Sequence, residues 1–219
     1  MHSSIKNLIN IKNNINVNLK NLKINNQIKI IAVSKTFKID NILPLIDQGH
    51  IHFGENKVQE AIEKWTTIKK ENSKIRLHMI GKLQSNKVKL AVNIFDYIHS
   101  VDSEKLAKKI SDESSKIDKK IKIFIQVNIG DEIQKSGVEK NDLEKLISCC
   151  KDLKLDLVGL MCIPPINTDP IKYFRDMQKL TNNHGFSELS MGMSSDYIQA
   201  VKYSATFIRI GSAIFGARS

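Results

Sequence analysis

One lysine stands at the end of an apolar, β-branched run near the start of the chain. The run, from Ile30 to Thr36, predicts a buried strand of a parallel sheet with Lys35 at its carboxyl end. Apolar walls favour the neutral form of an amine, and the neutral amine is the form that condenses with an aldehyde. Lys35 is therefore the candidate working group of the protein. The plainer alternative is a solvated lysine at a strand end.

Glycine and serine occur together after the last two predicted strands. Gly192 and Ser194 follow the seventh strand, and Gly211 and Ser212 follow the eighth. In a barrel of parallel strands these loops often bind phosphate, because glycine lets the backbone approach and helix N-termini present free N–H groups. The two turns therefore predict a phosphate site, with ordinary loops as the alternative.

Arg209 lies two residues before Gly211 on the eighth predicted strand. It is one of four arginines in a chain that otherwise uses lysine. A reactive amine and a phosphate site together suit an aldehyde-bearing phosphate cofactor, and pyridoxal 5′-phosphate carries both groups. Its ring nitrogen needs a protein partner that sets the electronic properties of the ring. Arg209 is the candidate for that role, and an ion-paired structural arginine is the alternative.

The elements that must position these residues alternate between strand and helix. Apolar periodicity predicts an amphipathic helix within residues 1–27 and a helix after each strand except the eighth. The helix after the first strand is expected to be capped by Asp40 and to end at Gly49. Strands are expected at 28–35, 51–54, 77–80, 97–101, 121–127, 155–162, 188–191 and 207–210. Such a series predicts a single (β/α)8 TIM barrel over residues 1–219 with the N-terminal helix packed on it. A doubly wound open sheet is the competitor, but no glycine-rich fingerprint follows the first strand.

The charge balance raises the question of an anionic partner. Lys+Arg 34 against Asp+Glu 23 gives a net charge of +11, as many proteins that bind nucleic acid or anionic membranes have. The excess is nearly all lysine, and isoleucine and asparagine are also abundant, as AT-rich codons would produce. Aromatic residues make up only 6% and do not interleave with a lysine-rich stripe, so stacking platforms for single strands are not indicated. We expect no nucleic-acid partner.

Cysteines, histidines and apolar runs bear on compartment and metal binding. Cys149, Cys150 and Cys162 form no CxxC pair and are expected to be reduced in a cytoplasmic protein. His50 and His52 have no third ligand nearby in sequence, so no metal is expected. The N-terminus has no signal-peptide core, and no segment has the roughly 20 apolar residues of a membrane span. We therefore expect a cytoplasmic protein without membrane contact.

Several motifs along the chain belong together. They are Ala-Val-Ser-Lys (32–35), Phe-Gly-Glu-Asn (53–56) with Val-Gln-Glu (58–60), His-Met-Ile-Gly-Lys-Leu-Gln-Ser-Asn-Lys (78–87), Lys-Ser-Gly (135–137), Gly-Leu-Met (159–161), Leu-Ser-Met-Gly-Met-Ser (189–194) with Asp196, and Arg-Ile-Gly-Ser-Ala-Ile-Phe-Gly-Ala-Arg (209–218). With these motifs the chain resembles the pyridoxal phosphate homeostasis proteins, also called the proline synthase co-transcribed homologues. The resemblance runs in order from Ile28 to the C-terminus and is looser over the Asn-rich first helix.

The resemblance implies a fold and a cofactor site. The fold is a single alanine-racemase-like barrel, in which pyridoxal phosphate (PLP) is held by Lys35 as a Schiff base, the internal aldimine. The resemblance further implies phosphate contacts from Ser194 and from the Gly211-Ser212 loop, and Arg209 facing the pyridine nitrogen. With Asn56 nearby and Ser190 at the end of the seventh strand, the expected cofactor-binding set is Lys35, Asn56, Ser190, Ser194, Arg209, Gly211 and Ser212.

The expected function is cofactor handling without established turnover. Racemases of this fold take a second acid/base from another domain, and this chain ends directly after the eighth predicted strand. An arginine at the ring nitrogen also weakens the electron-sink role of the ring. We therefore expect a monomeric carrier that buffers or delivers PLP in vitamin B6 homeostasis, with effects on amino-acid pools and with apo-enzymes as candidate recipients. One alternative is a low-activity racemase or lyase, in which His78 is either the base or a satisfied inward histidine of a barrel strand. The other is a basic nucleic-acid-binding protein that shares the barrel.

Overall fold

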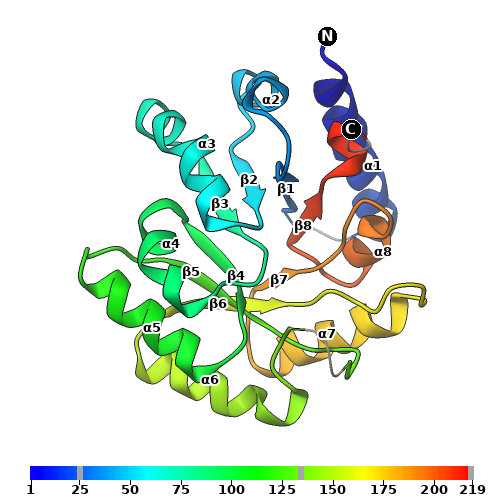
Figure 1. Ribbon diagram of the computed structural model, residues 1–219. Coiled ribbons are helices and arrows are strands. Elements are labelled where there is room, and N and C mark those ends of the chain that lie inside the picture. Colours follow the sequence, from blue (N-terminus) through cyan, green and yellow to red (C-terminus); the bar gives the residue numbers. More distant parts are fainter. Residues whose placement is uncertain (24–26, 133–135, 217–219) are drawn as a thin grey trace.

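The strands close on themselves into a barrel. The computed structural model describes residues 1–23, 27–132 and 136–216. Eight parallel strands follow one another around the barrel in chain order, and β1 pairs with β8 to close it. Helices surround the strands on the outside (Figure 1). The predicted (β/α)8 barrel is confirmed, and the open doubly wound sheet is excluded because it would leave two unpaired edges.

The strands are short and match the predicted positions to within a few residues. They are β1 (Lys29–Val33), β2 (His52–Glu55), β3 (Arg76–Met79), β4 (Tyr97–Val101), β5 (Lys122–Gln126), β6 (Asp156–Met161), β7 (Glu188–Ser190) and β8 (Phe207–Ile210). Apolar and β-branched side chains dominate them because most strands are covered on both faces. The predicted first strand ends earlier than expected, which leaves Lys35 in the loop after β1.

The helices follow the strands, with short 3₁₀ turns before three of them. They are α1 (Ser3–Leu22), η1 (Ile39–Asn41), α2 (Leu43–Asp47), α3 (Val58–Glu71), η2 (Ser85–Lys87), α4 (Val88–Ile94), α5 (Glu104–Ser115), η3 (Lys140–Asp142), α6 (Leu143–Asp152), α7 (Ile171–Asn183), α8 (Tyr197–Lys202) and α9 (Ser212–Phe215). The predicted cap at Asp40 was wrong. Asp40 lies inside η1, and α2 begins after it with Pro44 in its first turn, where the fixed φ of proline suits a helix start.

The N-terminal helix packs on the outside of the barrel. Leu8, Ile11 and Ile15 lie on its buried face, and the predicted amphipathic helix is confirmed. The Nδ2 atom of Asn7 donates to the carbonyl of Ile214 in α9 at 3.0 Å. α1 therefore lies against α9, the short helix that follows β8, and covers it from outside (Figure 1).

Two apolar layers hold the fold together. The larger one lies between the strands and the outer helices, and a smaller cluster of Ile31, Phe124, Met161 and Phe207 fills part of the barrel interior. Inward and outward positions alternate along each strand. The inward row of β1 therefore leads from Ile31 to Val33 and then to Lys35, which brings the amine to the carboxyl end of the barrel.

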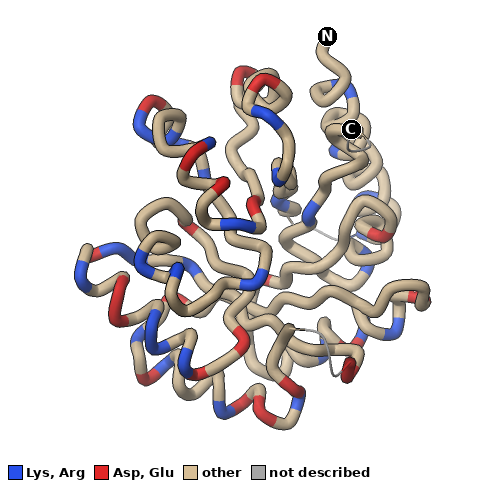
Figure 2. The backbone as a smooth tube through the Cα atoms, viewed as in Figure 1, with Lys and Arg blue, Asp and Glu red and all other residues tan. Residues whose placement is uncertain are grey.

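Charges of both signs cover the outer helices. Figure 2 shows Lys and Arg interspersed with Asp and Glu along α5 and α6. Ion pairs such as Lys145 Nζ to Glu104 Oε1 at 2.7 Å link neighbouring helices. In the ranges that the structure describes, none of the helices has both the length and the apolar character needed to cross a bilayer.

Candidate functional site

The residue before Lys35 is fixed by a buried carboxylate. Ser34 is fully buried, and its Oγ donates to Glu55 Oε1 at 2.7 Å. The same oxygen accepts from Lys64 Nζ and from Trp65 Nε1, each at 3.0 Å. The Nζ atom of Lys64 also donates to the carbonyl of Ser34 at 2.9 Å. Side chains of β2 and α3 thus hold the end of β1 on the N-terminal side of Lys35.

The residue after Lys35 is fixed in the same way. Thr36 has a positive φ of 68°, a conformation that non-glycine residues rarely adopt. Its N–H donates to Glu60 Oε1 at 2.6 Å, and Lys64 Nζ contacts the same oxygen at 3.0 Å. Although burial acts to raise it, the pKa of Glu60 is lowered by the Thr36 N–H and by Lys64. The carboxylate therefore holds the turn that directs Lys35 inward.

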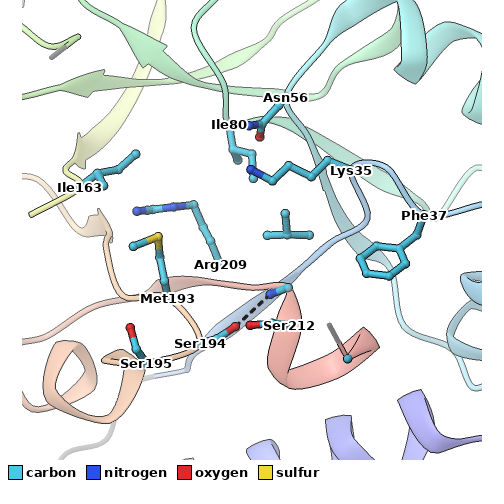
Figure 3. Close-up of a pocket in the computed structure, with 13 residues that line it drawn as sticks. Lys35, Phe37, Asn56, Ile80, Ile163, Met193, Ser194, Ser195, Arg209 and Ser212 are labelled. Atoms are coloured by element: carbon cyan, nitrogen blue, oxygen red, sulfur yellow. Dashed lines mark hydrogen bonds between the residues drawn. The ribbon is translucent and has the colours of Figure 1, made fainter. Parts of the chain in front are cut away.

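A cavity of about 560 Å³ opens at the carboxyl end of the barrel, beside this turn. Figure 3 shows the side chains of Lys35, from the loop after β1, and Arg209, from the neighbouring β8, extending into it. Its lining brings together residues from β1 and β8 and from the segments that follow β1, β2, β3, β6, β7 and β8. The lining residues are Val33, Lys35, Phe37, Asn56, Ile80, Ile163, Met193, Ser194, Ser195, Arg209, Gly211, Ser212 and Gly216.

One serine joins the two glycine-serine loops. The Oγ of Ser194 accepts from the N–H of Gly211 and from the N–H of Ala213, each at 3.3 Å. Figure 3 shows the first of these two hydrogen bonds. Gly192, with φ of 91°, allows the turn before Ser194, and a Cβ there would lie 2.6 Å from the Cβ of Ala200. Since Ser194 accepts from two donors, its own hydroxyl hydrogen is available to donate to a third group. N–H and O–H donors therefore gather at one wall of the cavity, as an anion-binding site requires.

Arg209 is buried beside these loops and keeps a fixed orientation. It is 4% exposed, its Nη1 donates to Ser190 Oγ at 2.8 Å, and its Nη2 donates to the carbonyl of Cys162 at 2.8 Å. Burial lowers the pKa of Arg209 from its ordinary value, but a guanidinium retains its proton in proteins. Its remaining N–H groups make Arg209 a cationic donor in the cavity wall.

Ser190 and His78 lie deeper in the barrel than expected. Ser190 is fully buried and outside the cavity lining; its Oγ accepts from Arg209 and lies 2.9 Å from His99 Nδ1. The geometry therefore gives Ser190 an indirect contact with the cavity, through Arg209. His78 is enclosed between His52 and His99, and burial, followed by the charge of His99, keeps its pKa well below the ordinary value. His78 is not among the described residues that line the cavity, so its candidate role as a base gains no support from this geometry.

Sequence reasoning missed the apolar part of the cavity wall and the carboxylates that hold Lys35. Ile80 follows β3 directly and Ile163 follows β6, so the strand-end rule that identified Lys35 applies to both. Phe37 packs on Phe215 with ring centroids 4.8 Å apart. Glu60 and Lys64 were detectable as an i,i+4 pair on α3, but their contact with the turn at Lys35 depends on how α3 packs.

The other predicted features lie apart from this cavity or outside the described residues. Cys150 and Cys162 are buried free thiols, and burial raises the pKa of each to about 12. Among the residues that the structure describes, no group of three or more His, Cys, Asp or Glu side chains is arranged to hold a metal ion. Lys135 of the Lys-Ser-Gly motif and residues 217–219 lie outside the described ranges.

The cavity combines three kinds of group that suit one ligand shape. Lys35 supplies a primary amine, Arg209 supplies a buried cationic donor, and the Ser194 loop supplies N–H and O–H donors. Ile80, Ile163 and Met193 provide apolar contact area between them. The arrangement suits a flat ligand that has a carbonyl group at one end, a hydrogen-bond acceptor in the ring and an anionic group at the other end.

Comparisons of the sequence connect this site to known proteins. A model of the alanine racemase N-terminal domain matches residues 7–219. The pyridoxal phosphate homeostasis protein of Pasteurella multocida is 36% identical over 202 residues, which are 87% of this chain and 87% of that protein. The protein of the same name from Escherichia coli K12 is 35% identical over 202 residues, 88% of this chain and 86% of that protein.

Solved structures agree with the sequence comparison. PipY of Synechococcus elongatus PCC7942, solved with PLP bound, matches with a TM-score of 0.81 and 33% identity, over 92% of this chain and 100% of that chain. An alanine racemase of Clostridium difficile 630 matches with a TM-score of 0.70 over 94% of this chain and 57% of that chain. Its identity is 15%, so this second match bears on the fold alone.

Proposed function

This chain belongs to the family of pyridoxal phosphate homeostasis proteins, and from that premise we propose that it binds PLP and holds it in exchange with other proteins. The observation that carries the proposal is that Lys35, Arg209 and the Ser194 loop all face one cavity. PipY, a relative at 33% identity, is solved with PLP bound. These three groups match the aldehyde, the ring nitrogen and the phosphate of that cofactor.

When bound, PLP supplies an aldehyde that condenses reversibly with a primary amine. Lys35 offers that amine from a turn fixed on both sides by Ser34 and Thr36. The hydroxyls of Ser194 and Ser212 would donate to the phosphate, and Arg209 would donate to the ring nitrogen. Asn56 lines the cavity near the end of Lys35 (Figure 3). The chain's residues thereby hold, orient and retain the cofactor.

The proposed role is that of a carrier rather than an enzyme with turnover. An arginine next to the ring nitrogen keeps that nitrogen unprotonated, because the guanidinium only donates hydrogen bonds. The described residues that line the cavity include no Asp or Glu, so a carboxylate that would protonate the ring is not offered from them. An unprotonated ring stabilises the loss of the α-proton of an amino acid only weakly. Exchange of the cofactor at Lys35 does not need that step and is not impaired.

We further propose that the protein releases the cofactor to apo-enzymes and that it acts as a monomer in the cytoplasm. The three free cysteines suit a reducing compartment. Effects on amino-acid pools follow, because many enzymes of amino-acid metabolism need PLP. By contrast, the Asp/Glu and Lys/Arg mixture on α5 and α6 (Figure 2) offers no uniform positive face there for nucleic acid.

A transfer experiment tests the carrier role. The loaded protein is mixed with an apo-enzyme that needs PLP, in the presence of an amine that traps free PLP. Recovery of enzyme activity faster than from an equal amount of free PLP supports delivery, and complete suppression by the trap contradicts it. Exchange of the α-proton of amino acids for deuterium, measured on the same loaded protein, would instead favour the low-activity racemase or lyase.

A further inference from the structure

A continuous line of hydrogen bonds crosses the inside of the barrel and ends at Arg209. Arg209 Nη1 lies 2.8 Å from Ser190 Oγ, and Ser190 Oγ lies 2.9 Å from His99 Nδ1. His99 Nε2 is 2.9 Å from His78 Nδ1, and His78 Nε2 is 3.0 Å from His52 Nδ1. The line joins five strands, from β8 through β7, β4 and β3 to the start of β2.

The line is enclosed by aromatic rings. Phe124 stacks on His99, with centroids 4.3 Å apart and an interplanar angle of 17°, and Tyr97 stacks on His78 with the same values. Phe207 meets both histidines, at 5.8 Å and 5.7 Å between centroids. His78 and His99 are fully buried. Competing water is therefore excluded around these two histidines, and the strength and direction of the hydrogen bonds between Arg209, Ser190, His99 and His78 depend on these residues alone.

The direction of the line follows from the chemistry of Arg209. A guanidinium has only donors, so Ser190 Oγ must accept from it. The hydroxyl hydrogen of Ser190 then needs an acceptor, and among the described residues the partner within reach is His99 Nδ1. A neutral imidazole that accepts at Nδ1 carries its hydrogen on Nε2. His99 Nε2–H then donates to His78 Nδ1, and His78 Nε2–H donates to His52 Nδ1. His99, His78 and His52 are therefore all assigned the Nε2–H form.

The charge state of the histidines agrees with this direction. Burial is the first cause that keeps the pKa of His78 and His99 well below the ordinary value, and the second cause for His99 is the charge of Arg209. Burial and then Lys29 lower the pKa of His52 to about 4. All three rings are therefore neutral at neutral pH. In the assigned form, each ring turns its lone-pair nitrogen toward Arg209 and its N–H away.

Resting on the PLP-binding function above, we propose that His52, His78, His99 and Ser190 form a polarised relay that holds Arg209 as a buried cation facing the cofactor. The ion pairs of the described residues do not include Arg209. Aligned imidazole dipoles stabilise the guanidinium in place of a carboxylate, which would neutralise it and draw it out of position. The three histidines are positioning residues, since they act on the cavity through Arg209.

Nuclear magnetic resonance of the protein without PLP tests the relay directly. Nitrogen-15 in the histidine rings, correlated with the ring carbon-bound protons, distinguishes the Nδ1–H, Nε2–H and charged forms. We expect His52, His78 and His99 all in the Nε2–H form at neutral pH. An Nδ1–H or charged form of any of the three would overturn the relay, whatever the protein does with PLP.

Variants at His99 test its effect on the cofactor site. His99→Phe keeps a ring to stack on Phe124 but removes the acceptor for Ser190, and we expect PLP to dissociate about fivefold faster, as for the loss of one hydrogen bond between neutral groups. His99→Asn places an amide oxygen near the former Nδ1 and should restore most of the retention. His50→Phe is the matched control, because His50 is buried and its hydrogen bonds go to the backbone of His52 and Ile30, not to a side chain of the relay.

The outcomes separate this proposal from the proposed function. Equal PLP dissociation from His99→Phe and wild type, with both folded by circular dichroism, would overturn the relay. Equal loss in His99→Phe and His99→Asn would also overturn it, because packing and not the acceptor would then be the cause. If wild type fails to bind PLP, the proposed function fails, and the ring tautomers alone decide on the relay.

Discussion

At the scale of single residues, Lys35 is distinguished by how firmly its neighbours are held. Many lysines in this chain extend into solvent, whereas the turn at Lys35 is hydrogen-bonded on both sides by Glu55 and Glu60. The amine is thereby held at the cavity without being required for the packing of the fold. Changes at Lys35 should therefore affect the ligand far more than the stability of the protein.

Lys35→Ala should abolish covalent attachment of PLP. Borohydride treatment of the wild type with PLP should leave a label that peptide mass spectrometry locates on Lys35, and the variant should carry none while remaining folded. Lys38→Ala is the control, since Lys38 is an exposed lysine close by. A label on another lysine at wild-type yield in Lys35→Ala would contradict the assignment.

Ser194→Ala should weaken binding of the phosphate group selectively. The change removes the acceptor for the Gly211 and Ala213 N–H groups and a donor to the anion, so we expect PLP affinity to fall by about tenfold. Affinity for pyridoxal, which lacks the phosphate, should stay nearly unchanged. Spectroscopic titration with both compounds measures the difference, with Ser195→Ala as control. An equal loss for both compounds would mean that Ser194 acts on the shape of the cavity instead.

At the scale of elements, α3 and β2 together hold the end of β1. Glu55 is fully buried and Lys64 has a side chain that is 10% exposed, so this pair is desolvated. Such a pair contributes little net stability as a unit, but the loss of one partner leaves a buried charge unmatched. The pair therefore couples the stability of the barrel to the position of Lys35.

Lys64→Met should destabilise the protein by about 3–5 kcal/mol, because Glu55 remains buried without its cation. The double variant Glu55→Gln with Lys64→Met should recover much of that loss. Urea denaturation of the two variants measures both values. Lys122→Met is the matched control, because its pair with Asp156 is exposed and should cost no more than about 1 kcal/mol. A single variant no less stable than the control would contradict the buried-pair account.

At the scale of the whole molecule, the barrel interior carries neutral histidines that the unfolded chain would protonate. Burial, with Lys12 as the next cause, lowers the pKa of His50 from 6.5 to about 4, and the pKa values of His52, His78 and His99 are lowered as well. Between pH 6.5 and pH 4 the unfolded state therefore binds more protons than the folded state. Stability must rise with pH across this window and fall as the pH drops through it.

Acidification from pH 6.5 towards pH 4 should thus lower the unfolding free energy, with each fully buried histidine contributing about 1.4 kcal/mol per pH unit. Urea denaturation at a series of pH values measures the slope. In His50→Phe the slope should be smaller by about that amount, because one such group has been removed. A slope equal to that of the wild type would show that His50 is protonated in the folded state.

Much of the architecture was predictable because its signals are local. The 207–210 and 97–101 strands were expected at the positions where β8 and β4 occur, since each is an apolar run bounded by turn residues. The short α9 was missed because four residues carry no periodicity. Asp40 was misread as a cap, because a 3₁₀ turn ahead of Pro44 uses the same residue types as a helix start.

The sequence by itself determined the order of strand and helix units, the lysine at the end of the first strand and the glycine-serine turns after the last two. These follow from side-chain periodicity and turn chemistry, which act between near neighbours in the chain. Tertiary structure alone decided that Ser190 accepts a hydrogen bond from Arg209 and that His99, 91 positions earlier, is hydrogen-bonded to Ser190. The reason is physical: which inward side chains meet across a closed barrel depends on strand tilt and stagger, and these are set only when the last strand pairs with the first.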